Sequence, residues 1–368
     1  MKTIDQQNSK KHLHSRPLLD TPSDLELFIN RADEINLALE SLENNYNILV
    51  SGDIGAGKTT FMHRLFALAE GKQFLPAFCD MSTFVSDVED FFDVLLYTVA
   101  NTISKKDVSQ RLKKTISELS GQLGISILGT GFSLNEKEKK IGWVEAKYKA
   151  MQELTRLVAE VNKDKSRIIF FIDNLKPVSD FYMELFGKYR DFLWQLKCNF
   201  VVTCSEYLLP TIWAPPVSSF FDIKITIKPM SKEELTKLLY LRGFKSKELI
   251  PYIHQISSGS PSIAINLARG LSVGQFNQEE LKRAGLEKSS NLNHLTPSEQ
   301  MVFKQIQLLG SVSASSKKLQ DATGQKRARL VQILRKLREE GVLIAERQGR
   351  TMYYRIKDDF YSTGREFL

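Results

Sequence analysis

One ten-residue stretch, SGDIGAGKTT at positions 51–60, limits what this chain can fold into more than any other feature. It fits the pattern G-x-x-x-x-G-K-[ST], and a chance match in a chain of 368 residues has a probability of roughly one in a hundred at average residue usage. The apolar segment YNILV precedes it, and TTFMHRLFALAEG follows with apolar residues at helical spacing and Gly71 as a helix stop. A strand, a glycine-rich loop and a helix in this order predict a phosphate-binding loop in an α/β fold.

The residue types of this loop suit ATP with Mg²⁺. Glycines allow backbone N–H groups to point at phosphate oxygens, and the helix N-terminus adds its dipole. We expect Lys58 to reach the β- and γ-phosphates and the Thr59 hydroxyl to ligate the metal. The loop residues predicted to contact the nucleotide are Gly52, Asp53, Ile54, Gly55, Ala56, Gly57, Lys58, Thr59 and Thr60.

Two further segments are predicted strands of the same parallel sheet. SRIIFFIDNL contains a continuous apolar run, typical of a strand buried on both faces, and ends in Asp173, which we expect to bind Mg²⁺ directly or through water. CNFVVTCSE ends in Thr203 and Ser205, which either contact the γ-phosphate and position water or are only hydrogen-bonded hydroxyls at a strand end. Both interpretations stay open. GISILGTGFSL has no helix signal directly after it, so residues 121–134 are expected to form a β-hairpin rather than a second nucleotide site.

Composition excludes several classes of protein. Apolar residues make up 42% and charged residues 26%, as in a globular protein rather than a disordered one. No apolar run approaches 18 residues, and the N-terminus has no apolar core of a secretory signal, so we expect no membrane partner and treat the first twenty or so residues as a mobile polar arm. The three cysteines, Cys79, Cys198 and Cys204, fit no zinc spacing and are expected to be free buried thiols in the cytoplasm.

Several motifs around the loop resemble the AAA+/STAND branch of P-loop ATPases, especially archaeal-type ATPases and origin-recognition or replication-initiator proteins. LFINRADEINLAL resembles the box that lines the adenine pocket: Arg31 and Glu34 match, and Asn30 replaces a glycine. ISSGSPSIAINLARG resembles the G-x-P motif of the helical lid, whose proline, here Pro261, packs near adenine. FDIKITIKPMSKEEL resembles the exit into that lid, and Ser231 with Glu234 independently predicts a capping box that starts a helix.

The departures from that family predict slow ATP hydrolysis. Asn174 follows Asp173 where the family often has a carboxylate that polarises the attacking water. SSFFD places Phe220 where the resemblance implies an arginine finger, and Ser262 stands in place of a lid arginine. The missing arginine would come from a partner or from a residue such as Arg190. The predicted catalytic set is Lys58, Asp173, Asn174, Thr203 and Ser205.

The last fifth of the chain is basic. Residues 295–368 contain 14 Lys or Arg and 8 Asp or Glu, which is +6 of the net charge of +8. HLTPSEQMVFKQIQLLGSV opens with a second capping box, Thr296 and Glu299; SASSKKLQDATG predicts a short helix and turn. QKRARLVQILRKLREEG predicts an amphipathic helix that ends at Gly341, with its apolar face at Leu330, Ile333, Leu334 and Leu337.

VLIAERQGRTMYYRI then predicts a hairpin around Gly349 with Met352, Tyr354 and Ile356 on one face, so the order of elements is that of a winged helix. The predicted contacts with double-stranded DNA are Lys326, Arg329, Gln332 and Lys336 on the helix and Arg347 and Arg350 beside the hairpin tip. The alternative is a winged helix that only packs or binds protein.

These observations predict an α/β P-loop NTPase core with a parallel sheet, a helical lid and a C-terminal winged-helix domain. The expected boundaries are 1–22 for the arm, 23–226 for the core, 227–290 for the lid and 291–368 for the winged helix. The expected function is an ATP-binding switch of the initiator or transposition-regulator type, which hydrolyses ATP slowly and assembles on DNA through its winged helix, as a homo-oligomer or with a protein partner. The alternative is a signalling or defence ATPase subunit whose nucleotide state gates protein assembly without DNA contact. A motor ATPase is disfavoured by the three departures.

Overall fold

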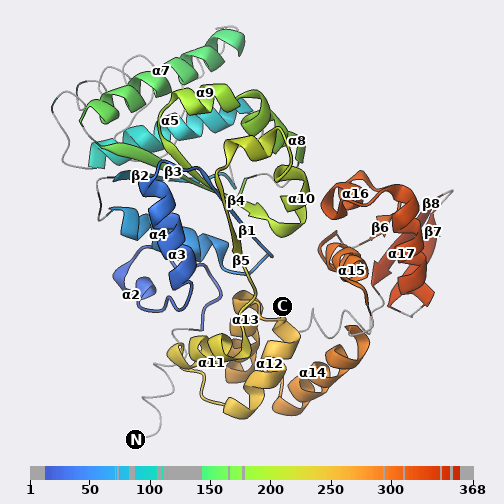
Figure 1. The fold of residues 1–368 in the computed structure, drawn as a ribbon. Helices are drawn as coiled ribbons and strands as arrows, with labels where there is room; N and C mark the ends of the chain where they lie inside the picture. Colours follow the sequence, from blue (N-terminus) through green and yellow to red (C-terminus); the bar gives the residue numbers. More distant parts are fainter. Residues whose placement is uncertain are drawn as a thin grey trace, which may run out of the picture.

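A computed structural model of the chain is shown in Figure 1. It describes residues 13–70, 72, 74–82, 88–105, 110, 114, 143–164, 166–175, 179–292, 295–309, 311–339, 342–348 and 351–356. The expected hairpin at 121–134 and the expected helix stops at Gly71 and Gly341 lie outside the described residues.

The core is a five-stranded parallel sheet with the order β2-β3-β4-β1-β5. Its strands are β1 (Ile48–Gly52), β2 (Phe74–Asp80), β3 (Arg167–Asp173), β4 (Asn199–Ser205) and β5 (Ile223–Ile227). β1, β3 and β4 are the strands that the apolar runs predict. The P-loop follows β1, which lies between the central strand β4 and the edge strand β5, and Asp173 ends β3 at the same carboxyl edge.

Helices cover both faces of this sheet, as its apolar runs require. Along β3, Ile168, Phe170 and Ile172 pack into one buried cluster, and Ile169 and Phe171 pack into another. The first cluster lies under α5 (Val88–Lys105) and α7 (Trp143–Lys163); the second lies under α3 (Ala32–Glu43) and α4 (Lys58–Glu70) (Figure 1). Alternate side chains thus enter opposite layers, and the predicted α/β class is confirmed.

Short helical segments complete the core. They are α2 (Pro22–Leu25), α8 (Ser179–Tyr182), a π-helix η3 (Met183–Lys188), α9 (Arg190–Gln195), α10 (Leu209–Ile212) and the 3₁₀ turns η4 (Glu206–Leu208) and η5 (Val217–Phe220). Cys79 and Cys204 are buried, Cys198 is partly buried, and all three are free, as expected.

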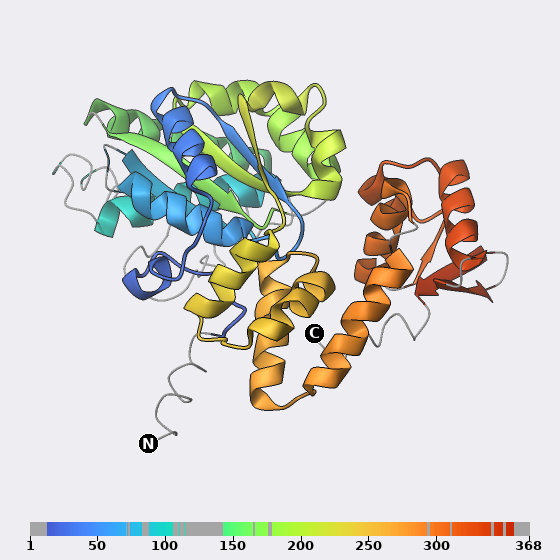
Figure 2. The same ribbon diagram turned by 60° about the horizontal axis from the view of Figure 1, so that its bottom comes forward.

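A helical unit follows β5. It contains α11 (Lys232–Leu241), the 3₁₀ turn η6 (Lys247–Leu249), α12 (Ile250–Ser257), α13 (Pro261–Val273) and α14 (Gln278–Leu292). The capping box is present: the Ser231 hydroxyl accepts from the Glu234 N–H, and the Glu234 carboxylate accepts from the Ser231 N–H. Pro261 occupies the first turn of α13, where a missing N–H costs no hydrogen bond. Figure 2 shows α14 leading from this bundle toward the C-terminal unit.

The C-terminal unit has helices α15 (Pro297–Leu309), α16 (Lys317–Thr323) and α17 (Arg327–Glu339) and strands β6 (Val312–Ser313), β7 (Leu343–Gln348) and β8 (Thr351–Ile356). The strands form an antiparallel sheet in the order β6-β8-β7. The four predicted apolar residues of α17 are buried, and the Thr296–Glu299 capping box is formed. Tyr354 and Ile356 are buried as expected, but Met352 is 37% exposed, because it lies next to the hairpin tip, beyond the packed part of the sheet.

The N-terminal segment corrects one expectation. Residues 13–20 are not a mobile arm in this structure: Leu13 and Leu18 are buried at 3% and 5% exposure. Leu13 belongs to the apolar cluster of the helical unit, and the Leu18 N–H donates to the Thr60 hydroxyl of α4. The sequence prediction missed Leu13 and Leu18 because the rest of the segment is mostly polar. Among the described residues, no helix is long and apolar enough to span a bilayer.

Candidate nucleotide-binding site

The P-loop has the backbone geometry that a phosphate cradle needs. Gly55 and Gly57 have φ values of +77° and +100°, in the left-handed region that favours glycine. A side chain at Gly55 would also collide with the helical unit, because its Cβ would lie 2.8 Å from the Ser260 Oγ. Glycine at position 55 therefore allows both the turn and the close approach of α13.

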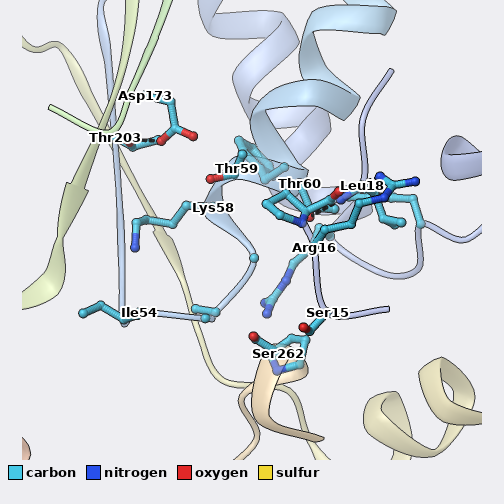
Figure 3. A pocket seen from close by; sticks show the side chains of 18 of the residues that line it. Ser15, Arg16, Leu18, Ile54, Lys58, Thr59, Thr60, Asp173, Thr203 and Ser262 are labelled. Atoms are coloured by element: carbon cyan, nitrogen blue, oxygen red, sulfur yellow. Dashed lines mark hydrogen bonds between the residues drawn. The ribbon is translucent and has the colours of Figure 1, made fainter. Parts of the chain in front are cut away.

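The Lys58 ammonium is held by the loop itself. Its Nζ donates to the carbonyl oxygens of Gly52 at 2.9 Å and Asp53 at 3.0 Å. Burial lowers the pKa of Lys58, while the negative charge of Asp173 acts in the opposite direction. Figure 3 shows this side chain and Thr59 in the cavity with Asp173 and Thr203. A triphosphate would replace the two carbonyl contacts with stronger charge-assisted ones.

Asp173 has the features of a metal-binding carboxylate. It is 2% exposed, and its Oδ1 accepts a 2.5 Å hydrogen bond from the Thr203 hydroxyl (Figure 3). Its Oδ2 is buried and has no hydrogen-bond partner in the part of the chain that the structure describes. A buried oxygen without a partner is costly, and a hydrated cation beside the Thr59 hydroxyl would satisfy it. These residues therefore fit Mg²⁺, which remains a prediction.

Thr203 and Ser205 both line the cavity, but in different situations. The Thr203 hydroxyl is engaged with Asp173 and so orients that carboxylate. Ser205 lies at the end of β4 and is partly buried. Contact of either hydroxyl with a γ-phosphate stays a prediction.

Asn174 contacts a carboxylate that the sequence analysis missed. Asn174 has φ +57°, and its Nδ2 donates to the Asp80 Oδ1 at 3.1 Å. Asp80 ends β2 and is the register partner of Asp173 on β3. Burial alone would raise the pKa of Asp80, but hydrogen bonds from Asn174 and Ser82 outweigh burial and lower it. The sequence contains a signal for Asp80, because FLPAFCD is another apolar segment that ends in an acidic residue, upstream of the strand that ends in Asp173.

The predicted adenine box is only partly at the cavity. Arg31 lines it, binds Glu34 at 3.3 Å and donates to the Lys228 carbonyl; Asn30 is not among the lining residues. Asn30 instead has φ +60°, a left-handed conformation that asparagine tolerates, which explains how it replaces a glycine. Other apolar walls come from Leu27, Phe28, Met230, Leu238, Pro261 and Ile265.

The cavity has a volume of about 500 Å³ and lies between the P-loop, the helical unit and the N-terminal segment. The Ser262 N–H and the Ser260 hydroxyl both donate to the Gly55 carbonyl, at 3.4 Å and 3.2 Å. Of the predicted loop residues, those from Ile54 to Thr60 line the cavity, whereas Gly52 and Asp53 lie outside its lining. The Asp53 carboxylate instead pairs with Lys304 of α15 at 2.9 Å.

The N-terminal segment adds residues that no motif predicted. Arg16 lines the cavity and forms two hydrogen bonds with the buried carboxylate of Asp24. Arg242, at the end of α11, also lines the cavity and donates to the His14 carbonyl at 3.0 Å. The only sequence signal for this segment was its pair of leucines, Leu13 and Leu18.

Phe220, at the expected arginine-finger position, is buried in an aromatic cluster. Phe220 is 1% exposed and packs against Phe186, Phe200 and Phe221. Beside it, Arg190 donates to the Ser219 hydroxyl at 2.8 Å and stacks over the Trp194 ring. Arg190 thus lies next to the predicted finger position but on the outside of the aromatic cluster.

The predicted DNA-contacting residues lie in different environments. Lys326, Arg329 and Gln332 are exposed, and Arg329 donates to the Gln332 side chain at 3.1 Å. Lys336 instead pairs with Glu299 of α15 at 2.8 Å, so it stabilises the packing of α17 on α15. Arg347 is exposed on β7, and Arg350 lies outside the described residues.

Part of the chain matches a known family of P-loop domains. Residues 28–200 match the sequence profile of the KAP family P-loop domain. No curated protein matches the chain. Three solved structures align over most of their lengths at low identity. They are ORC2 of Aeropyrum pernix (14% identity, 91% of this chain and 92% of that chain, TM-score 0.42), Cdc6p of Pyrobaculum aerophilum (15%, 95% and 96%, 0.42) and RuvB of Thermotoga maritima (17%, 95% and 97%, 0.38).

The family match covers β1, the P-loop, β3 with Asp173 and the first residues of β4. It therefore includes the same lysine, threonine and aspartate that the cavity brings together. Residues 28–200 are therefore similar to the P-loop domain of the KAP family.

Proposed function

We propose that this protein is an ATP-binding switch with slow ATPase activity. The observation that carries the proposal is the cavity, in which the P-loop is already in contact with the helical unit through Gly55. ATP would be held by residues 54–60, Mg²⁺ by Thr59 and Asp173, and the base by the apolar wall around Pro261. A nucleotide that touches both units can bias how they pack, which is the physical basis of a switch.

The domain boundaries are part of this proposal. We assign residues 23–226 to the ATPase core, 227–290 to a lid and 291–368 to a winged helix, with 1–22 as an N-terminal segment. Separate buried clusters beneath the sheet helices, in the helical unit and in the C-terminal unit support this division.

Slow turnover follows from what surrounds the γ-phosphate position. The residue after Asp173 is an amide, Phe220 is buried, and Ser262 carries no charge. Arginine fingers contribute roughly 10³–10⁵ in rate where they are known, so the replacement of arginine at positions 220 and 262 is expected to be a large loss. We expect steady-state hydrolysis by the purified protein well below roughly 10 s⁻¹. Turnover at or above that rate without a partner would contradict this part of the proposal.

We further propose that the C-terminal unit binds double-stranded DNA. The exposed side chains of Arg329 and Gln332 lie on α17, the exposed Lys326 directly precedes that helix instead of lying on it as expected, and Arg347 lies on the adjacent hairpin. Cations on such a surface bind phosphates, and an amide on the helix can read adenine in the major groove. ATP would tighten binding if lid closure aligns neighbouring subunits on DNA.

A salt titration of duplex affinity with ATP, with ADP and without nucleotide tests this proposal. Each phosphate contact contributes about 0.9 to the slope of log affinity against log salt, so changing Arg347 and Arg350 together to Ala should lower the slope by up to about 2. Changing Lys188 and Lys197, which lie on the core, to Ala is the matched control and should leave the slope nearly unchanged. Gln332→Ala should alter sequence preference rather than slope.

The second candidate is a subunit whose nucleotide state gates protein assembly. Two cations of the C-terminal unit are engaged within the chain, Lys304 with Asp53 of the P-loop and Lys336 with Glu299. The first pair links this unit to the first residues of the P-loop. Absence of duplex binding at low salt in all three nucleotide states would favour this candidate.

A further inference from the structure

ATP hydrolysis needs a group that orients and deprotonates the attacking water, and the residue after Asp173 is an amide. Asn174 cannot accept that proton. The parallel sheet offers another source, because the carboxyl ends of adjacent strands meet at one edge. β2 and β3 pair from Phe74↔Arg167 to Asp80↔Asp173, so two acidic residues end neighbouring strands at the same level.

Asp80 is fixed in this position by contacts on both sides. Its Oδ1 accepts hydrogen bonds from the Asn174 Nδ2 at 3.1 Å and from the Ser82 N–H at 3.0 Å. The Met81 N–H donates to the Asp173 carbonyl at 3.0 Å, which continues the pairing of the strands beyond Asp80. A carboxylate held in this way is oriented before substrate binds, which reduces the cost of reaching the transition state.

Asp80 lies outside the cavity lining, and its hydrogen-bond partner Asn174 is the lining residue next to it. Asn174 lines the cavity beside Asp173, and its left-handed backbone turns the chain at the end of β3. Its amide reaches Asp80 on the next strand, although 94 residues separate the two in sequence. The amide thus stands between the predicted metal residue and the only additional acid that the register places beside it in the described strands.

We propose that Asp80, oriented by Asn174, is the carboxylate that activates water for ATP hydrolysis in this protein. The proposal rests on the proposed function, because it requires ATP at the P-loop. The water oxygen forms a bond to the γ-phosphorus, and the bond from the γ-phosphorus to the β–γ bridging oxygen breaks. The water proton passes to the Asp80 carboxylate, and ADP leaves with the bond's electron pair. The products are ADP and phosphate.

Two features agree with this role. The hydrogen bonds from Asn174 and Ser82 orient the ionised carboxylate, and because they lower the pKa of Asp80 they also make it a weak proton acceptor, which agrees with slow hydrolysis. An aspartate is also one methylene shorter than glutamate, which agrees with slow hydrolysis. Asn174 acts here as a positioning residue, not as a catalytic one.

The test combines ATP affinity, measured by calorimetry, with single-turnover conversion of prebound ATP to ADP. Asp80→Asn should bind ATP within about threefold of the parent but convert it at least about 10²-fold more slowly, the usual contribution of a positioned base. Asp80→Glu should keep measurable conversion. The matched control, Asp321→Asn, changes an exposed carboxylate of the C-terminal unit and should leave both readouts unchanged.

A swap of the two side chains gives a second test. In Asp80→Asn combined with Asn174→Asp, the carboxylate moves across the hydrogen bond to the position after Asp173, where aspartate tolerates the left-handed backbone. We expect part of the lost conversion to return. Asn174→Ala should lose about tenfold in conversion with unchanged ATP affinity, because Asp80 remains but is less well oriented.

The outcomes separate the two proposals. Conversion by Asp80→Asn at the parent rate, or loss of ATP binding in that variant with its thermal unfolding unchanged, would overturn the role of Asp80. A parent protein that binds ATP but forms no ADP would overturn it too, leaving the switch intact. ATP binding that is absent in the parent, or insensitive to Lys58→Ala, would instead overturn the nucleotide site itself.

Discussion

The two walls of the cavity are built in opposite ways. One wall is contiguous: seven consecutive residues, 54–60, form the loop and the start of α4. The other wall joins segments that are far apart, as in the bond from Ser260 to Gly55 across 205 residues and the bond from Arg242 to His14 across 228 residues. The residue types of the first wall are enough to predict that it binds phosphate. The second wall closes the cavity, and its formation depends on how separate units pack.

This difference predicts that substitutions in the contiguous wall affect nucleotide binding directly. Those in the assembled wall should act mainly through docking and stability. Four substitutions test the distinction, in order of decreasing effect.

Lys58→Ala should have the largest effect on ATP affinity. It removes a buried ammonium that would contact the β- and γ-phosphates, and hydrogen bonds to charged groups contribute about 1.5–3 kcal/mol, or roughly 10–150-fold in affinity. Calorimetric titration with ATP measures the change, and circular dichroism shows whether the variant is folded. Unchanged affinity in a folded variant would remove the P-loop assignment.

Asp173→Asn should weaken the dependence of ATP binding on Mg²⁺ by about tenfold, because the metal shell loses a charged oxygen. The Thr203 hydroxyl can still donate to the amide oxygen, so the fold should be retained. ATP titrations with and without Mg²⁺ measure this effect. Thr203→Val is the companion variant, and we expect it to have a smaller effect because it only releases the carboxylate. Equal enhancement by Mg²⁺ in parent and Asp173→Asn would identify another metal residue.

Arg16→Ala tests the assembled wall. Arg16 holds Asp24 through two hydrogen bonds, one of them at 2.6 Å, and Arg16 is half exposed, so we expect a loss of about 1 kcal/mol in unfolding free energy. ATP should dissociate a few-fold faster, because the segment that covers the cavity is less firmly docked. Chemical denaturation and stopped-flow release of labelled ATP measure the two effects. An equal loss of Mg²⁺ dependence would show that the two walls are not separable.

The same pair predicts a pH dependence. The hydrogen bond from Arg16 is the main cause that lowers the pKa of Asp24 in the folded protein, while burial opposes it. The stabilisation is therefore complete above the ordinary aspartate pKa of about 3.9 and disappears as the pH falls through the lower folded value. The difference in stability between parent and Arg16→Ala should accordingly shrink only in strongly acidic buffer.

Lys304→Ala should have the smallest effect. Its pair with Asp53 joins α15 to the P-loop, but both side chains are largely exposed, and such pairs contribute about 0.2–1 kcal/mol and are screened by salt. We expect a small increase in the distance between the C-terminal unit and the core, measured by fluorescence energy transfer at low salt. High salt should produce the same change in the parent. No change in either condition would mean that other contacts hold the unit.

The local parts of this fold and site could be predicted from the sequence. The P-loop, the strand that ends in Asp173, both capping boxes and the leucines of α17 each depend on a few neighbouring residues or on one period of an element. Met352 and Lys336 were less predictable, because their environment depends on where the sheet ends and which helix packs nearby.

By itself, the sequence determined the P-loop, the strand that ends in Asp173, the parallel character of the sheet and the three departures that predict slow hydrolysis. These features follow from residue type and spacing within short segments. Only the tertiary structure decided that Asp80 meets Asn174, that residues 15–18 line the cavity and that Asp53 faces Lys304. Those contacts depend on strand order, register and the docking of separate units, which no local pattern encodes.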